Sequence, residues 1–391
     1  IGNLGGPDLQ INLPLDVEIL EAKGKHIYPG MIAANSVLGL TEINAVRATR
    51  DMIEPGEINP NARAIVSINP DSELIPVTRA NGVLATLTIP RTGSGGLIAG
   101  QSALIRLDGW TWEDMEIKSP VGLHVFWPSL RTYSRWTSSE DEEELEKLRK
   151  AYAEKVRKIE NAFADARAYQ KAKKDQKSNT ENDLRWEAMV EVLEGKATVF
   201  IHANTIAQIR AALHFAETNG IEKPVIVGGI DAPKAVSELK EQEAAVILGA
   251  VNSLPIRRYE AYDTPYVAAK KLHEAGIPFC ISNTGSAFDA ANERNLPYQA
   301  GRAVAHGLPH DIGLKSVTLF PAQILGVADR LGSIEEGKEA TFFLSNGDPL
   351  EVRTNVEAAW VQGRKIDLSS RHTQLWKKYS ERNRQKKEAA E

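Results

Sequence analysis

The sequence lacks most of the features that would place it in a special class of protein. Among 391 residues there is one cysteine, Cys280, which excludes an internal disulfide. No apolar run approaches the roughly 18–20 residues of a membrane-spanning helix. Basic and acidic residues nearly balance, with a formal net charge of −5, so neither nucleic acid nor an anionic membrane is expected as a partner.

Several common catalytic motifs are also absent. There is no Gly-x-Ser-x-Gly nucleophile elbow and no dinucleotide-binding fingerprint. The glycine-rich stretch 93–102 (GSGGLIAGQS) lacks the Gly-Lys-Ser/Thr ending of a phosphate loop, which indicates a tight loop instead. Cys280 lies in an apolar run (IPFCIS), which favours a buried structural thiol over a nucleophile.

Short apolar runs that alternate with helical patterns extend through most of the chain from Pro29. This alternation is typical of a parallel sheet built from strand–helix units. Eight such strands close a barrel, whose active sites lie at the carboxyl ends of the strands. The expected strands are residues 30–34, 83–89, 103–107, 123–126, 197–201, 225–227, 245–248 and 279–282.

Three segments fall outside this alternation. Residues 1–28 contain short strand material broken by glycine and proline, and need strands from elsewhere to form a sheet. Residues 138–193 are strongly charged with apolar residues at helical spacing, which predicts a long solvated helix, a break at 175–181 and a second helix. Residues 368–391 are expected to be a polar helical tail.

The stretch at residues 23–40 (KGKHIYPGMIAANSVLGL) is the most distinctive in the chain. It resembles the entry to the first barrel strand in the amidohydrolase superfamily, which reads close to G-K-x-V-x-P-G-x-I-D-x-H-x-H-x-G. Residues 96–103 and 112–117 resemble segments of an imidazolonepropionase-like subgroup. The segment from Pro321 resembles the C-terminal region of the family. Within 23–40 the matching residues are Gly24, Lys25, Pro29, Gly30, Ile32 and Gly39.

The resemblance implies a fold and a division into domains. The fold is α/β, a (β/α)8 TIM-like barrel with a small β-sandwich formed by the N- and C-terminal segments. Residues 1–28 and 333–367 are the two parts of the sandwich. Residues 29–332 are the barrel, including the charged excursion 138–193, and residues 368–391 are the tail.

The resemblance also implies a metal centre, from which this sequence departs. Metal-dependent members carry two histidines after strand one, a carboxylated Lys or a Glu after strand four, a histidine after strands five and six, and an Asp after strand eight. His202, after strand five, is the one unchanged ligand. The other positions hold Asn35 and Val37, His124, Gly228 and Asn283.

Two neutral imidazoles without a carboxylate make a weak metal site, because zinc normally has three or four ligands. No metal cofactor is therefore expected; the alternative is a single weakly bound divalent metal at His202 and His124. The candidate catalytic residues are His202, His124 and Asn283, although a structural role remains open for each histidine. The expected binding pocket consists of Asn35, His124, His202, Gly228 and Asn283.

The expected function is a catalytically silent amidohydrolase-family protein that binds a ligand or a partner. The alternative is a divergent hydrolase of C–N bonds in cyclic amides or related substrates. A homo-oligomer or a hetero-complex with a metal-bearing relative is expected, through the excursion 138–193 or through Phe288 and Leu296 in the loop 286–297; both segments could instead merely cover the barrel. The protein is expected to be soluble, either cytoplasmic or exported after removal of a leader not present in this chain.

Overall fold

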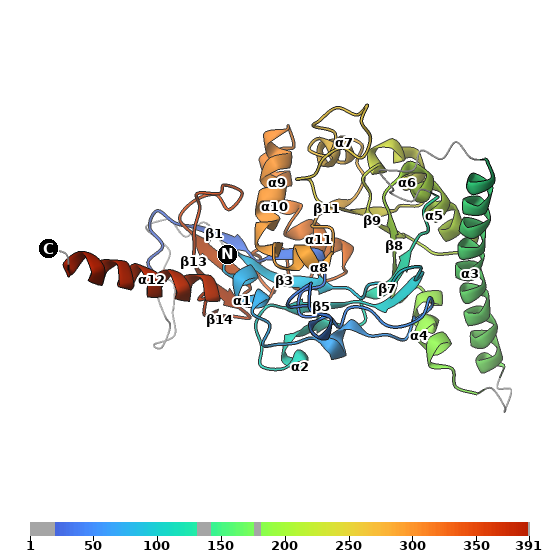
Figure 1. Cartoon of the computed structure of the whole chain (residues 1–391), viewed down its shortest axis with the longest axis horizontal. Coiled ribbons are helices and arrows are strands. Elements are labelled where there is room, and N and C mark those ends of the chain that lie inside the picture. Colours follow the sequence, from blue (N-terminus) through green and yellow to red (C-terminus); the bar gives the residue numbers. More distant parts are fainter. Residues whose placement is uncertain (1–19, 131–141, 176–180, 390–391) are drawn as a thin grey trace.

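The structure is a computed structural model that describes residues 20–130, 142–175 and 181–389 (Figure 1). It has an α/β architecture in which two sheets form the central body and a third sheet lies at one end. In Figure 1 this third sheet and helix α12 (Arg371–Glu388) lie at the opposite end of the molecule from α3 (Glu142–Lys174). No helix in the described ranges is both long and apolar enough to cross a membrane.

The two central sheets contain all eight strands expected from the sequence. Strands β2 and β3 are buried at every residue, as expected for strands covered on both faces. One sheet has the order β2 (Met31–Ser36), β3 (Val83–Thr88), β5 (Ala103–Arg106), β6 (Glu116–Lys118). The other has the order β11 (Phe279–Ile281), β10 (Ala245–Leu248), β9 (Val225–Gly228), β8 (Thr198–Ala203), β7 (Gly122–Phe126), β4 (Ile98–Gln101).

The expectation that all these strands run parallel is wrong for the third. Strand β5 pairs antiparallel with β3, and β4, just before it in the chain, pairs antiparallel with β7. The connection from β3 to β5, residues 89–102, contains β4 but no helix, and the crossover between parallel strands is usually a helix. The chain instead returns to β3 in the opposite direction.

The segment at Ser316 and Val317 lies between the outer strands of the two sheets. The N–H of Ile281 in β11 donates to the carbonyl of Ser316 at 3.0 Å, and the N–H of Ile32 in β2 donates to that of Val317 at 2.8 Å. In the described residues the strands nevertheless count as two sheets, with no continuous ladder from β11 to β2.

The third sheet joins the two ends of the chain. Its order is β1 (His26–Pro29), β12 (Phe342–Ser345), β13 (Val356–Val361), β14 (Arg364–Ile366), and every pairing is antiparallel. It is a single sheet in the described residues, and the sandwich stays a prediction. Residues 1–19 lie outside the described residues, so the division into domains stays a prediction.

Close packing fixes this sheet to the central body. Phe343 is fully buried, and a Cβ at Gly82 would lie 2.9 Å from its ring. Gly82 also has a φ of +85°, so glycine is needed there for both space and conformation. Gly30 donates its N–H to the Thr341 carbonyl at 3.0 Å, and a Cβ there would lie 2.9 Å from Leu84. The Pro-Gly at the start of β2 thus lets the sheet approach closely.

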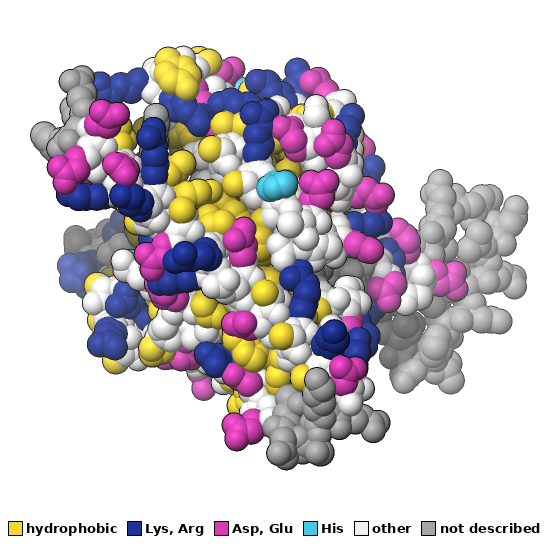
Figure 2. All heavy atoms as spheres, turned by 90° about the vertical axis from the view of Figure 1, so that its right-hand side faces the viewer, with side chains coloured by type: hydrophobic (Ala, Val, Ile, Leu, Met, Phe, Trp, Pro, Cys, Tyr) yellow, Lys and Arg dark blue, Asp and Glu magenta, His cyan; other side chains and the backbone are white. Residues whose placement is uncertain are grey.

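Helices surround the sheets. α3 lies in the charged excursion and packs on α5 through Phe163, whose ring meets Phe215 edge-on at 5.1 Å. On the face that presents α3, basic and acidic side chains are interspersed (Figure 2). The α-helices are α1 (Leu74–Arg79), α2 (Trp112–Met115), α3 (Glu142–Lys174), α4 (Leu184–Leu193), α5 (Ile206–Thr218), α6 (Val236–Glu241), α7 (Ala268–Glu274), α8 (Ala287–Ala290), α9 (Leu296–Ala305), α10 (His310–Lys315), α11 (Leu319–Ile324) and α12 (Arg371–Glu388). Short 3-10 helices cover Arg47–Thr49, Ala64–Ser67, Ala232–Lys234 and Glu293–Asn295.

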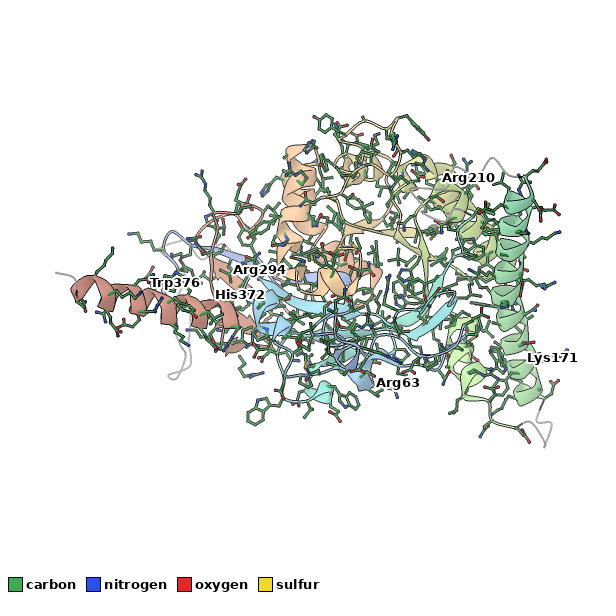
Figure 3. All side chains as sticks on the ribbon, viewed as in Figure 1. Arg63, Lys171, Arg210, Arg294, His372 and Trp376 are labelled. Carbon is green, nitrogen blue, oxygen red and sulfur yellow. The ribbon has the colours of Figure 1, made fainter. Side chains whose placement is uncertain are left out.

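Helix α12 extends away from the body and buries none of its own residues. His372 and Trp376 lie on it (Figure 3), and Trp376 is 70% exposed. Most of the residues of α12 are charged or polar, which fits a solvated helix.

Candidate functional site

A cavity of about 380 Å³ lies at the carboxyl ends of the central strands. This is the end at which barrel enzymes place their active sites. Its wall combines apolar side chains with amides, hydroxyls, one imidazole and one guanidinium. The lining residues are Asn35, Arg91, Phe126, Trp127, His202, Asn204, Gln208, Val227, Gly228, Ile230, Gly249, Ala250, Ser253 and Thr284.

A larger hollow of about 880 Å³ lies at the opposite ends of the strands. Its lining includes Thr198, Val225, Ala245 and Phe279, the first residues of four neighbouring strands. It contains none of the residues predicted from the sequence, and this end of a barrel serves stability rather than catalysis. The smaller cavity is therefore the candidate functional site.

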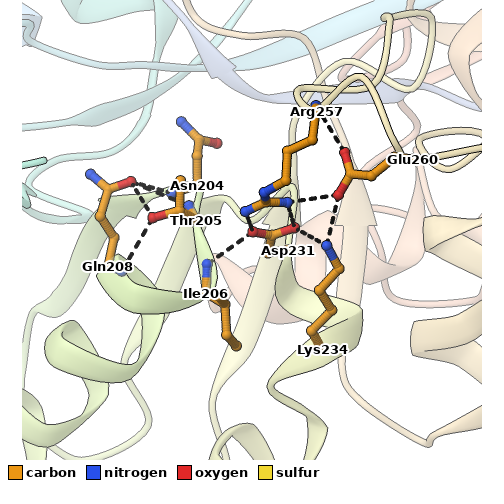
Figure 4. Close-up of polar contacts among 8 residues, drawn as sticks. All are labelled: Asn204, Thr205, Ile206, Gln208, Asp231, Lys234, Arg257 and Glu260. Atoms are coloured by element: carbon orange, nitrogen blue, oxygen red, sulfur yellow. Dashed lines mark hydrogen bonds and ion pairs between the residues drawn. The ribbon is translucent and has the colours of Figure 1, made fainter. Parts of the chain in front are cut away.

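The start of α5 holds one side of the cavity in place. Thr205 Oγ1 accepts a hydrogen bond from the Gln208 N–H at 3.4 Å, and Gln208 Oε1 accepts one from the Thr205 N–H at 3.2 Å (Figure 4). This capping box pins the first turn of the helix. Gln208 Nε2 also donates to the Trp127 carbonyl at 3.0 Å. The ring of Trp127 is held from outside, because its Nε1 donates to Tyr152 of α3 at 3.3 Å.

The predicted pocket residues come together, but not all of them reach the cavity. Asn35, His202 and Gly228 line it. His124 and Asn283 are almost fully buried behind the wall, where His124 contacts His202 and the Asn283 carbonyl accepts a bond from Asn35 Nδ2 at 2.9 Å. His124 and Asn283 thus support the wall, while the other three form part of it.

The two histidines are hydrogen-bonded to each other. His124 Nδ1 and His202 Nε2 lie 2.9 Å apart, so one nitrogen donates and the other accepts. The rings stack on neighbouring aromatics, with His202 3.9 Å from the Phe126 centroid and His124 4.7 Å from that of Phe200. His124 Nε2 is buried and has no partner among the described residues.

Both imidazoles are neutral near pH 7. Burial, with a smaller contribution from the Arg91 charge, lowers the pKa of His124 to about 3. The pKa of His202 is lowered well below its usual value by burial, by His124 and by Arg91. Neutral imidazoles can accept a proton or bind a metal, but each already uses one nitrogen in the mutual bond.

Asn283 belongs to a buried polar chain. Its Nδ2 donates to Glu293 Oε2 at 2.8 Å, and its Oδ1 accepts from Gln299 Nε2 at 3.0 Å. Burial raises the pKa of Glu293 to about 8, which hydrogen bonds from Asn283 and Ser36 only partly offset. Glu293 is therefore mainly protonated at pH 7, and the amide of Asn283 is fixed on both sides.

Arg91 is a site residue that the sequence reasoning missed. It lies in the cavity wall with its Cζ 5.0 Å from the centroid of Phe126. Its guanidinium has no hydrogen-bond or ion-pair partner in the described part of the chain. Burial lowers the pKa of Arg91, which an arginine can tolerate without losing its charge. The available signal was its position, directly after Ile89-Pro90 at the carboxyl end of a barrel strand.

Comparison with known proteins bears on the origin of this arrangement. No family model matches the chain. It is 25% identical over 389 residues to amidohydrolase tasK from Hapsidospora irregularis, an alignment that covers 90% of this chain. It resembles the crystal structure of an amidohydrolase from Thermotoga maritima MSB8 with a TM-score of 0.78 and 26% identity, over 93% of this chain and 91% of that one.

The chain belongs to the amidohydrolase superfamily. It spans 37% of the length of the Hapsidospora protein. A prolidase matches with a TM-score of 0.50 and 16% identity, over 92% of this chain and 91% of that one, and shows the fold alone. A molinate hydrolase does the same, with a TM-score of 0.50 and 12% identity over 92% and 86% of the two chains.

The strand ends of this amidohydrolase-superfamily chain do not fit a divalent metal. In the part of the chain that the structure describes, no group of three His, Cys, Asp or Glu residues is placed to hold an ion. The two imidazoles bond each other, and the positive charge of Arg91 disfavours a second cation beside them. No Asp or Glu is among the described residues that line the cavity.

Proposed function

We propose that this amidohydrolase-superfamily chain is catalytically silent and binds a small ligand in the cavity at the carboxyl ends of its central strands. The observation that carries the proposal is the 2.9 Å hydrogen bond between His124 and His202. This bond occupies one nitrogen of each of the two imidazoles that would be the nearest candidates for metal ligands. The cavity wall beside them contains the guanidinium of Arg91, at the strand ends where metal-dependent members of the family bind a metal cation.

Hydrolysis of the ordinary family type needs a bound metal to lower the pKa of a water, and a base to take its proton. A metal normally needs three or four ligands, and the cavity offers one imidazole directly and one behind it. The position of the family's aspartate base is Asn283, whose amide is uncharged and has both ends occupied. Glu293 is close to Asn283 but is protonated at neutral pH.

Metal content tests this proposal. The purified chain and its His202→Ala variant are equilibrated with zinc chloride, desalted, and analysed by mass spectrometry for metals. We expect the two proteins to retain the same low amount of zinc, because His202 is not part of a metal site. Stoichiometric zinc in the parent chain that is lost in His202→Ala contradicts the proposal.

A divergent hydrolase of C–N bonds in cyclic amides is the second candidate. It is supported by the amidohydrolase names of the Hapsidospora and Thermotoga relatives and by a cavity with several hydrogen-bonding groups. Its reaction would have to use His202, with His124 as support. Turnover of a cyclic amide such as hydantoin that disappears in His202→Ala, and survives in an exposed-histidine control such as His372→Gln, would favour this candidate.

We also propose that the chain associates, either with a second copy or with a metal-bearing relative. Phe288, in the loop 286–297, is 71% exposed and available for such a contact. Leu296 is buried and is not. The bond from Trp127 to Tyr152 of α3 supports the alternative that the excursion covers the barrel. Light scattering tests self-association, and a monomer at micromolar concentration contradicts that version. Copurification of a relative with an intact His-x-His supports the mixed version, and recovery of this chain alone contradicts it.

A further inference from the structure

We propose that the cavity recognises a small organic carboxylate, and that Arg91 binds the carboxylate group. This inference rests on the proposed function of the cavity as a binding site and names the chemical class of its ligand. It starts from the unpaired guanidinium of Arg91 in the cavity wall.

Arg79 and Arg106, two other arginines with little exposure, have acceptors within the protein. Arg79 donates to Asp108 at 3.0 Å, and Arg106 donates to the carbonyls of Asp114 and Glu116, both at 2.9 Å. Arg91 has no such partner among the described residues, and its side chain is only partly exposed. A charge held partly away from water without a partner is costly, so an arginine that keeps its guanidinium free in a cavity is suited to an external anion.

The charge of the surrounding wall points the same way. No carboxylate lines the cavity in the described residues, and His202 and His124 are neutral at pH 7. Asp289 interacts electrostatically with Arg91 but makes no ion pair with it, and its Oδ2 accepts hydrogen bonds from the N–H and hydroxyl of Thr284. Arg91 is therefore the one charged side chain among the described residues that line the cavity, and it favours an anion.

A carboxylate fits this arrangement better than a phosphate. A guanidinium presents two parallel N–H donors that match the two oxygens of a carboxylate, with one positive charge for one negative charge. A phosphate group is close to doubly charged at pH 7, and no lysine or second arginine lines the cavity to balance it. The ring of Phe126 beside Arg91 restricts the orientation of the guanidinium.

The remaining wall indicates the rest of the ligand. Phe126, Trp127, Val227 and Ile230 form apolar surface, which suits a ring or an aliphatic body. The side chains of Asn204 and Ser253 add hydrogen-bonding groups, and neither side chain has a hydrogen-bond partner in the described part of the chain. A volume of about 380 Å³ lies within the range of cavities that bind small molecules.

Calorimetric titration with matched probes tests the inference on chelator-treated full chain. Three carboxylates, acetate, benzoate and N-benzoylglycine, are compared with their primary amides at constant ionic strength, and benzyl phosphate is the phosphate arm. The variants are Arg91→Met, Arg91→Lys and the control Arg210→Met. Arg210 lies on the exposed side of α5 (Figure 3) and its loss gives the same change in net charge.

We expect at least one carboxylate to bind more tightly than its amide. Arg91→Met should weaken that carboxylate roughly 30-fold or more, as for the loss of one partner of a buried charge pair, and leave the amide unchanged. Arg91→Lys should retain part of the affinity, and Arg210→Met all of it. The inference is overturned if carboxylates and amides bind alike, if no carboxylate binds, if Arg91→Met has no effect, or if benzyl phosphate binds more tightly than every carboxylate. Equal binding of carboxylate and amide would contradict the carboxylate inference but not the proposed binding function of the cavity. Zinc held by His202 would contradict the proposed function itself.

Discussion

Two arginines near the carboxyl ends of the central strands show opposite uses of a buried guanidinium. Arg257, in the loop after β10, donates to Asp231 at 2.9 Å and to Glu260 at 2.7 Å, and Lys234 completes the cluster (Figure 4). Arg91, after β3, has no partner in the described residues. Hydrogen bonding to Asp231 raises the pKa of Arg257, whereas burial lowers that of Arg91.

The paired cluster also holds backbone. Asp231 Oδ2 accepts the N–H of Ile206, the first residue of α5, at 3.0 Å. Although burial alone would raise the pKa of Asp231, its bonds to Arg257, Lys234 and Ile206 lower it to about 2. The cluster thus connects α5 to the loops after β9 and β10. Both loops contribute to the cavity wall. A charge with its partners inside the chain stabilises the fold, and a charge without them is available to a ligand.

The largest expected effect is a difference in stability between the two arginines. Arg257→Met should lower the free energy of unfolding by roughly 3–5 kcal/mol, because it leaves the buried carboxylate of Asp231 with only Lys234 and the Ile206 N–H as partners. Arg91→Met should leave the free energy of unfolding unchanged or raise it by about 1 kcal/mol, because it removes a partly buried charge that makes no hydrogen bond or ion pair among the described residues. Urea denaturation at pH 7 measures both. Equal destabilisation by the two substitutions would remove the distinction.

Glu293 provides a second case of a buried ionisable group with incomplete pairing, since its Oε1 has no partner among the described residues. Its pKa is raised from 4.5 to about 8, so the stability that the protonated group gives is fully present below pH 4.5 and is lost as the pH rises to 8. Glu293→Gln stays neutral, and its free energy of unfolding should therefore gain roughly 3–4 kcal/mol over that of the parent chain between pH 5 and pH 8. Denaturation at both pH values measures this.

The matched control for that experiment is Glu241→Gln, at an exposed position on α6. Its free energy of unfolding should differ from that of the parent chain by the same amount at both pH values. A Glu293→Gln curve parallel to that of the parent would show that Glu293 is ionised in the folded protein at pH 7.

The smallest effect concerns the histidine pair. The pKa of His124 is lowered from 6.5 to about 3, so its contribution to stability is fully present above pH 6.5 and is lost as the pH falls toward 3. His124→Gln keeps a neutral polar group opposite His202. Its free energy of unfolding should therefore lie within about 1 kcal/mol of that of the parent chain at pH 7.5, and the variant should unfold less readily in acid. Thermal melts from pH 7.5 to 4 check this against His372→Gln, at an exposed position on α12. Identical acid sensitivity of the parent and His124→Gln would contradict a buried neutral His124.

Much of the fold could be predicted because it depends on local patterns. Apolar runs such as 245–248 and 279–281 have the composition of buried strands, and the Pro29-Gly30 pair lies just before β2. The direction of β5 could not be predicted, because it depends on whether a short connection can cross over the sheet.

The site was predictable only in part, for a related reason. Asn35, His202 and Gly228, which line the cavity, could be predicted because their positions at strand ends follow from the family pattern. The bond between His124 and His202 depends on the register of two neighbouring strands, β7 and β8, which pairs Phe126 with His202. The role of Arg91 depends on the absence of a partner in space, which no local pattern reveals.

A crystal structure of the chain grown with zinc chloride and N-benzoylglycine, with anomalous data at the zinc absorption edge, tests whether the strand ends bind an anion through Arg91 and no cation through the histidines. We expect a carboxylate on the Arg91 guanidinium and no anomalous peak beside His202 or His124. An anomalous peak at bonding distance from His202, with Arg91 free of ligand, would contradict this expectation.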